Sequence, residues 1–406
     1  MKLNYGRLFL LGLGFMSISL SWAVYNAFVP IFLDNALPAM TFRGLAIGFI
    51  MTFDNIASIT LQPYFSARSD STWNSFGRRM PYLLIGMPIA AIAVTVIPIV
   101  KSNLALMIGS ILVMNISMAV FRAPTVALMP DITPIAQRSK ANGVINLMGG
   151  LGGLIAYFIG SKLYDVHPVV PFAMAGIVML LVLVTLKAFM KEPEVAEGKH
   201  GDEKPVSIFE ALKEAFAPEK RSLLFLLLAI MFWFMGWNAL DTFFTLYARN
   251  VWNIKESTAA FYLGLGNVSF LLFAIPSGLL GTRFGKKAII TAGIIWLICV
   301  MTVMTILSLT GTNQVGPAVM ALLVAAGIGW ALINIHSFPM VVEMTTASKT
   351  GAYTGLYYFF SAMAMIIAPP LFGIIRDIVG SMYPLFPFSA VFFLLALWSF
   401  SKVSAQ

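Results

Sequence analysis

The chain is poor in charge. Asp, Glu, Lys and Arg make up 11% of its 406 residues, and hydrophobic residues make up 59%. Globular domains average ~25% charged residues. One membrane-spanning helix uses ~20 apolar residues, so the apolar content is sufficient for roughly a dozen spans. A water-soluble chain could not bury that much apolar surface. The composition therefore predicts a polytopic membrane protein.

Cysteine and histidine are also scarce. The single cysteine, Cys299, cannot form an internal disulfide. The three histidines are not placed at metal-ligand spacing, and no Gly-x-x-x-x-Gly-Lys-Ser/Thr phosphate loop is present. The net charge of +9 is not gathered into one basic tail or face. We therefore expect no metal, no cofactor, no nucleic-acid partner and no ATP-driven pumping.

Apolar runs interrupted by charge, proline or glycine predict twelve spanning helices. In the first half these are residues 8–33, 44–65, 81–100, 104–129, 143–164 and 168–190. In the second half they are residues 223–247, 258–281, 288–309, 315–342, 351–375 and 384–400. The first run is longer than the core of a signal peptide and lacks a small-x-small cleavage site after it, so we interpret it as a retained span.

The basic residues predict the orientation. Of 26 Lys and Arg, nineteen fall in the termini and loops on the terminal side, six fall in the opposite loops, and Arg122 lies inside a span. Basic loops stay in the cytoplasm during insertion. We therefore expect both termini to be cytoplasmic, in a multi-pass protein of the cell membrane.

The two halves repeat with an offset of 212 residues. The matching positions are Asn26 and Asn238, Asp131 and Glu343, Gly143 and Gly355, and Asp165 and Asp377. We predict an N-terminal six-helix bundle over residues 1–190, a charged cytoplasmic linker over 191–221 and a C-terminal six-helix bundle over 222–406. Parallel six-helix repeats are typical of alternating-access transporters that hold substrate near the membrane midplane.

Two loops carry motifs. After the eighth helix the chain reads Gly278-Leu-Leu-Gly-Thr-Arg283-Phe-Gly285-Lys286-Lys287, and its counterpart in the first half reads Asp70-Ser-Thr-Trp-Asn-Ser-Phe-Gly77-Arg78-Arg79. These resemble the signature loop of the major facilitator superfamily. The longer first-half loop, together with Pro124-Thr-Val-Ala-Leu-Met-Pro130-Asp131, resembles the glycoside–pentoside–hexuronide cation symporters and the sucrose transporters.

That resemblance implies a twelve-helix protein with two pseudo-symmetric bundles and a sugar or glycoside carried through a central cavity, with H⁺ or Na⁺. Melibiose-type symporters have paired aspartates at the positions of Ser58 and Gln62. Here the nearest acid is Asp54, one turn earlier. The expected coupling ion is therefore H⁺, with Na⁺ as the open alternative.

Three ionisable residues lie well inside spans. A charge at the centre of a spanning helix costs ~2.5–3.5 kcal/mol on insertion scales, so such residues normally face a cavity or a partner. We predict that Asp54 accepts the coupled proton with Arg122 as its partner, because an opposite charge and burial shift a carboxyl pKa in opposite directions. A static ion pair that fixes helix packing is the alternative.

The third charge, Asp241, shares a helix face with Trp237 and lies beside Asn238. The first helix offers Trp22, Tyr25 and Asn26. Aromatic rings set among a few polar groups are the usual pattern of a ligand site, so we predict that these six residues bind the sugar. Helix packing and the interfacial aromatic belt are the alternative interpretation.

His336 is a second candidate for proton coupling because histidine titrates near neutrality. A buried, hydrogen-bonded histidine without a coupling role is the alternative. The resemblance also implies a cytoplasmic gate, which would comprise Asp70, Arg78, Arg79, Asp131, Arg138, Arg283 and Glu343. Solvated loop charges are the alternative there, since exposed ion pairs contribute only ~0–1 kcal/mol.

The sequence thus predicts a monomeric secondary transporter, embedded in membrane lipid, that moves a sugar or glycoside with H⁺ and is not an enzyme. Export of amphipathic compounds is the nearest alternative, because soft Met-rich surfaces accept varied ligands. Lysolipid movement is a further transport alternative. A polytopic membrane enzyme is the alternative from another class.

Overall fold

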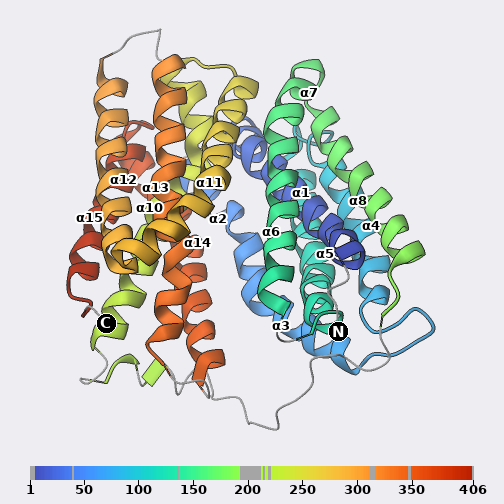
Figure 1. The fold of residues 1–406 in the computed structure, drawn as a ribbon. Helices are drawn as coiled ribbons and strands as arrows, with labels where there is room; N and C mark the ends of the chain where they lie inside the picture. Colours follow the sequence, from blue (N-terminus) through green and yellow to red (C-terminus); the bar gives the residue numbers. More distant parts are fainter. Residues whose placement is uncertain are drawn as a thin grey trace. The chain divides into compact units, whose positions relative to one another are not determined.

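The computed structural model describes residues 5–38, 41–134, 137–192, 212–213, 215–217, 221–310, 316–345 and 349–404. Within these ranges the chain is almost entirely helical (Figure 1). Most of the predicted 191–221 linker lies outside the described residues.

Twelve helical segments correspond to the twelve predicted spans. In the first half they are α1 (Tyr5–Ala36), α2 (Arg43–Met51) continued by α3 (Phe53–Ser71), α4 (Met80–Val96), α5 (Leu104–Asp131), α6 (Arg138–Leu154) continued by the π-helix η2 (Ile155–Gly160) and α7 (Ser161–Val166), and α8 (Val169–Phe189). In the second half they are α10 (Arg221–Trp252), α11 (Glu256–Phe284), α12 (Lys286–Leu309), α13 (Gly316–Glu343), α14 (Thr350–Val379) and α15 (Leu385–Ser401).

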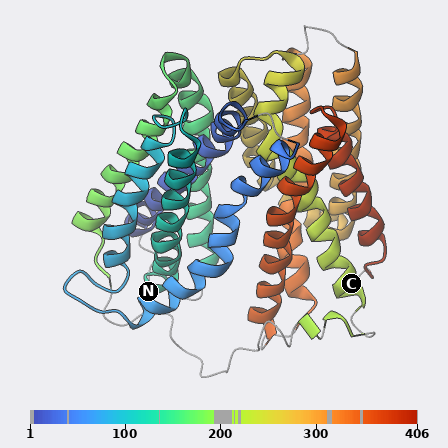
Figure 2. The ribbon, with the colours of Figure 1, turned by 180° about the vertical axis from the view of Figure 1, so that it is seen from behind.

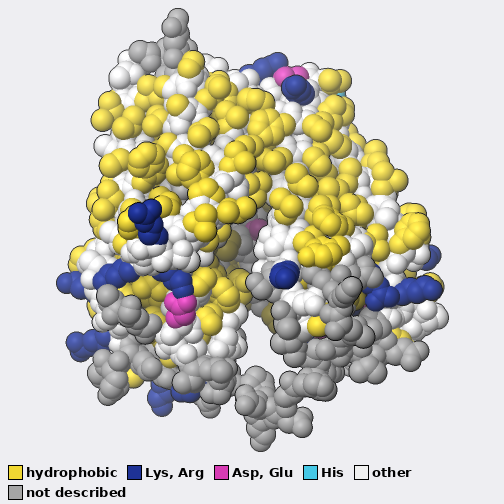
Figure 3. Space-filling view, viewed as in Figure 1, with side chains coloured by type: hydrophobic (Ala, Val, Ile, Leu, Met, Phe, Trp, Pro, Cys, Tyr) yellow, Lys and Arg dark blue, Asp and Glu magenta, His cyan; other side chains and the backbone are white. Residues whose placement is uncertain are grey.

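Among the described residues, ten of these segments are long and apolar enough to cross a membrane, and α4 and α15 are shorter apolar helices. Large apolar side chains are exposed on them, including Ile92 at 64% and Ile275 at 76%. Hydrophobic side chains cover most of the visible surface in Figure 3. Such a surface suits lipid rather than water, which confirms the predicted all-α polytopic membrane fold.

The described residues pack into two compact units. Unit 1 falls within Met1–Met40 and Ile50–Gly201, and unit 2 falls within Thr41–Phe49 and Asp202–Gln406. In unit 1, α1 packs on α6, α8 and α5, while α3 and α4 pack on α5. The approach of α6 to α1 is close because residue 152 is glycine, and a Cβ there would lie 2.1 Å from the carbonyl oxygen of Met16.

In unit 2, α10 packs against α14 and α15, and α13 packs against α11 and α12. Aromatic side chains fill the space between α10 and α15. Tyr247 meets Trp252 and Phe386 with ring centroids 4.9 and 4.6 Å apart, and all three residues are buried.

The second span is broken, and its two parts belong to different units. The helix is interrupted at Thr52, and α2 packs on α14 within unit 2 (Figure 2). The two carboxylate oxygens of Asp377 accept hydrogen bonds from the backbone N–H of Gly44, at 2.7 Å, and of Leu45, at 2.9 Å. A Cβ on Gly48 would lie 2.3 Å from the carbonyl oxygen of Pro369. Asp377 therefore caps α2 at its N-terminus, and Gly48 allows the two backbones to touch.

Candidate functional site

The interior of unit 1 holds polar atoms that the protein does not satisfy. Tyr25 on α1 is 0% exposed and Asn115 on α5 is 2% exposed. The Tyr25 hydroxyl, both polar atoms of the Asn115 amide and the indole Nε1 of Trp22 are buried and have no hydrogen-bond partner among the described residues. An unsatisfied buried polar group costs ~1–3 kcal/mol, so groups of this kind call for an explanation.

These side chains are neighbours. The rings of Trp22 and Tyr25 meet edge to face, with centroids 5.5 Å apart at 86°. The Asn115 amide lies beside the Tyr25 hydroxyl, although no hydrogen bond of normal geometry joins them. Asn26, half-buried, follows one turn after Trp22 on α1. The predicted group on the first helix is thus joined by an amide from α5 that the sequence analysis missed.

Asp54 and Arg122 border the same region. Asp54 lies in the first turn of α3, just after the break at Thr52, where the helix dipole favours a carboxylate. The Asn55 amide donates a 2.8 Å hydrogen bond to Asp54 Oδ1. Asp54 lies within electrostatic range of both Tyr25 and Arg122. Arg122 follows Asn115 by two turns on α5 and shares its face. The structure thus brings the predicted pair into one region, and their role in proton coupling stays a prediction.

Unit 2 contains the second predicted group. Trp237 on α10 stacks on Trp330 of α13, with ring centroids 4.5 Å apart at 7°. The Asn238 amide donates a 2.8 Å hydrogen bond to the carbonyl of Phe234. Trp237 and Asp241 line a small cavity of ~20 Å³ together with Asn267 of α11, which is room for about one water molecule. Trp330 is the member of this group that the sequence analysis missed.

His336 joins two helices of unit 2. It is buried on α13, and its Nε2 lies 2.9 Å from the Ser277 carbonyl and 3.2 Å from the Ser277 hydroxyl, both on α11. A Cβ on Gly281 would lie 2.1 Å from the imidazole ring. The imidazole is therefore held tightly in a helix contact. Its predicted part in proton coupling is untested.

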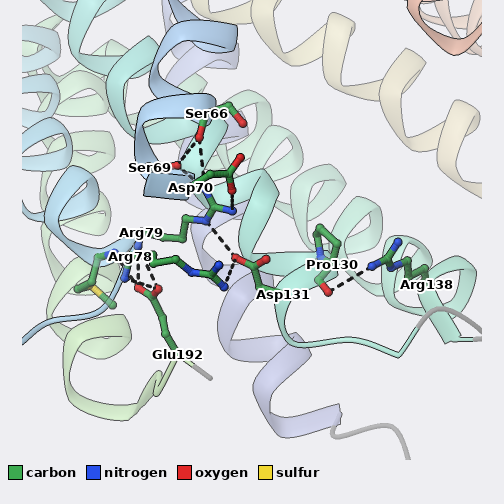
Figure 4. Close-up of polar contacts among 10 residues, drawn as sticks. Ser66, Ser69, Asp70, Arg78, Arg79, Pro130, Asp131, Arg138 and Glu192 are labelled. Atoms are coloured by element: carbon green, nitrogen blue, oxygen red, sulfur yellow. Dashed lines mark hydrogen bonds and ion pairs between the residues drawn. The ribbon is translucent and has the colours of Figure 1, made fainter. Parts of the chain in front are cut away.

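Four charges of the predicted gate lie together at one end of unit 1 (Figure 4). Arg79, 3% exposed, donates from Nε to Asp131 Oδ2 at 3.0 Å and from its terminal nitrogens to Asp70 and Ser69. Arg78 lies 3.7 Å from the same oxygen of Asp131. Burial alone lowers the pKa of Arg79, but hydrogen bonds and charges from Asp131 and Asp70 outweigh burial and raise it. The cluster ties α3, α4 and α5 together.

Glu192 is a further member that the sequence analysis missed. Its carboxylate accepts hydrogen bonds from the backbone N–H of Arg78 and Met80, each at 2.7 Å, and from that of Arg79 at 3.0 Å. These N–H groups lie just before α4 and at its first residue, so Glu192 caps the N-terminus of α4. Glu192 is 112 residues further along the chain than Met80. Arg138 makes a weaker contact, 3.5 Å from Nη2 to the Pro130 carbonyl.

The corresponding end of unit 2 repeats the pairing. Glu343, the repeat partner of Asp131, forms an ion pair with Lys286 at the start of α12. The guanidinium of Arg283 lies over the ring of Phe284, 5.2 Å from its centroid. In each unit, a basic residue beside the start of the third span thus holds the acid at the end of the fourth. Whether these residues act as a gate stays a prediction.

Comparison with known proteins identifies the class. The model of the Major Facilitator Superfamily matches residues 11–369, with a second match over 251–404. The chain belongs to this superfamily of membrane transporters, whose members bind small-molecule substrates. It is therefore a multi-pass transporter of the cell membrane and not an enzyme.

Individual relatives are distant. The chain is 26% identical over 163 residues to the human "Proton-associated sugar transporter A", covering 36% of this chain and only 21% of that protein. It is 24% identical to "Tetracycline resistance protein, class D" of Salmonella ordonez, over 81% of this chain and 79% of that protein. The crystal structure of a D-xylose-proton symporter superposes with a TM-score of 0.76 at 12% identity, covering 99% of this chain and 98% of that one. At that identity the match shows the fold alone.

Proposed function

We propose that the protein is a secondary transporter that moves a sugar or glycoside by alternating access, coupled to H⁺. The observation that carries the proposal is the interior of unit 1, where Asp54 and Arg122 border the unsatisfied polar atoms of Tyr25 and Asn115. The names of the human relative and of the structural neighbour, both proton-linked sugar transporters, support it.

Asp54 is the proton acceptor in this proposal. Protonation removes its negative charge and with it the attraction to Arg122, so the two protonation states favour different arrangements of the helices that carry them. A change of 1.4 kcal/mol in that preference changes the population ratio tenfold. In this proposal substrate binding and proton uptake are linked through Asp54, which lies within electrostatic range of the Tyr25 hydroxyl.

The proposal keeps the six substrate contacts predicted from the sequence. In unit 1 the proposal assigns them to Trp22, Tyr25 and Asn26, and in unit 2 to Trp237, Asn238 and Asp241. Ring faces stack on the apolar face of a pyranose, while amides and carboxylates bind its hydroxyl groups. The stacked pair Trp237 and Trp330 supplies such a ring face.

The test uses protein reconstituted in proteoliposomes. A pH gradient and a Na⁺ gradient are imposed separately, and uptake of labelled D-xylose, D-glucose, melibiose and sucrose is followed. We expect uptake driven by the pH gradient. Asp54→Asn should abolish this drive and leave sugar counterflow, which needs no gradient, within about threefold of wild type.

A matched control removes a carboxylate charge at the surface. Glu256 pairs with Arg249 at 3.5 Å on a partly exposed face, so Glu256→Gln should retain proton-driven uptake. Unaltered proton coupling in Asp54→Asn would remove Asp54 from the proposed role.

Export of amphipathic compounds is the second candidate. It is favoured by the match to the tetracycline resistance protein, which extends over more of this chain than the match to the sugar transporter. Proton-dependent export of a lipophilic dye, with no sugar counterflow, would support this candidate and overturn the first.

A further inference from the structure

Buried hydroxyls on α1 and α5 normally bond to their own helix. Ser21 donates to the Ser17 carbonyl at 2.9 Å, and Thr125 donates to the Phe121 carbonyl at 2.8 Å. The same two helices leave the polar atoms of Trp22, Tyr25 and Asn115 without hydrogen-bond partners in the part of the chain that the structure describes. Among the described residues of α1 and α5, buried polar atoms without a hydrogen-bond partner thus occur only on these three neighbouring side chains.

The hydrogen-bond donors and acceptors of these three side chains match a ligand that carries hydroxyl groups. The Asn115 amide offers two donors and one acceptor, the Tyr25 hydroxyl can donate or accept, and the Trp22 indole donates. Each hydroxyl of a sugar both donates and accepts, so two adjacent hydroxyls match this set. A cationic amphiphile provides few acceptors, and the donors of Asn115 and Trp22 would stay unpaired in its presence.

We propose that Asn115, with the Tyr25 hydroxyl and the Trp22 indole, forms a subsite that binds adjacent hydroxyl groups of a polyhydroxylated substrate such as a pyranose. Asn115 is then a specificity-determining residue of the transporter. The proposal rests on the proposed function and narrows its substrate class.

Asn115→Leu tests the subsite, because leucine has nearly the same volume and no polar atoms. The measurements are the thermal unfolding midpoint of purified protein with and without each sugar of the panel, and the KM of counterflow. We expect the variant to unfold at or above the wild-type temperature without sugar. The stabilisation by sugar should be lost, and KM should rise about ten- to hundredfold. Tyr25→Phe should raise KM in the same direction.

Thr125→Val is the matched control. It removes a buried hydroxyl on α5 that its own helix satisfies, and it should leave KM within about twofold of wild type. Mono-deoxy analogues of the stabilising sugar give a second readout. Wild type should discriminate strongly against the analogue that lacks one of the bound hydroxyls, and Asn115→Leu should lose that discrimination.

The outcomes distinguish failure of the Asn115 subsite from failure of the proposed sugar transport. If wild type transports a sugar and Asn115→Leu keeps its KM and its discrimination, the atoms hold a structural water only and the subsite is overturned while the proposed function stands. If no sugar of the panel stabilises the wild type or gives counterflow, both the subsite and the proposed sugar transport are overturned.

Discussion

At the scale of single residues, the Arg79 side chain joins several groups of the described cluster. It is nearly inaccessible to solvent and serves Asp70, Asp131 and Ser69 at once. A guanidinium suits this position because its donors are spread in a planar fork, whereas a lysine presents one compact charge. Breaking a buried ion pair costs ~3–5 kcal/mol because the remaining charge is left uncompensated.

Arg79→Lys should therefore lower the thermal unfolding midpoint of the purified protein, and by more than Arg138→Lys does. Arg138→Lys should lower it little, because Arg138 makes only a 3.5 Å contact to a carbonyl. Equal midpoints for the two variants would show that the cluster does not hold α3, α4 and α5 together.

The same arginine predicts a pH response. Its pKa is raised in the folded protein, so the stability it contributes is fully present below the unfolded pKa and is lost only as pH rises through the folded one. Both lie far above neutrality. The difference in unfolding midpoint between wild type and Arg79→Lys should therefore vary little across the alkaline range from about pH 7 to 9, measured by thermal unfolding.

The candidate site residues were predicted mainly from residue type, that is, from charged and aromatic residues inside apolar spans. Charges inside apolar spans indicated Asp54 and Arg122. In the structure Asp54 lies within electrostatic range of both Arg122 and Tyr25. Asn115 is a single uncharged amide in an apolar run, so a search for charges and aromatic residues misses it. Glu192 was not predictable, since its bonds to the start of α4 depend on contacts between distant parts of the chain.

At the scale of elements, the docking of α2 on α14 is the contact with the clearest consequence. The Asp377 carboxylate accepts hydrogen bonds from two N–H groups in the first turn of α2. Replacing this carboxylate by an amide removes the charge and one acceptor oxygen. Loss of such a cap costs ~0.5–2 kcal/mol. Asp377→Asn should therefore weaken the docked arrangement.

Cysteine labelling measures this. Ile47 on α2 is 0% exposed, so Ile47→Cys in a Cys299→Ser background should react slowly with a maleimide. Adding Asp377→Asn should raise the labelling rate several-fold, and Ser381→Ala, in the turn after α14, should not. An unchanged rate with Asp377→Asn would show that the carboxylate does not hold α2 in place.

Helix positions were predictable because apolar length and helix-breaking residues are local properties. The expected run 104–129 became α5, Leu104–Asp131, with the Asn103 side chain accepting from Leu106 N–H at its start. The break at Thr52 has no such signal, since neither proline nor glycine lies at that residue. The two parts of this span pack on different helices, α2 on α14 and α3 on α5, and the sequence pattern does not contain these contacts.

At the scale of the whole molecule, apolar content and the twelve-span count predicted a polytopic membrane protein, and the motifs of two cytoplasmic loops carried the resemblance to the superfamily. Substrate and coupling ion did not follow from these features, and the chain matches both a relative named for sugar transport and one named for tetracycline resistance. The expected monomer likewise stays a prediction.

Orientation is a further prediction at this scale. Nineteen of 26 basic residues lie on the side of the termini, which predicts that both termini face the cytoplasm. A reporter protein that is fluorescent only in the cytoplasm should be bright when fused after residue 406. A periplasmic phosphatase fused there should be inactive. The reverse pattern would contradict the charge rule for this chain.

The broken second span also bears on where the protein can be divided. The repeat suggests a cut within residues 191–221, yet Thr41–Phe49 packs with the unit formed by the later part of the chain. A fragment ending before such a cut would carry a short helix whose capping carboxylate, Asp377, is on the other fragment. The two halves of this transporter are therefore not interchangeable modules, because the second unit includes a piece of polypeptide that the first half encodes.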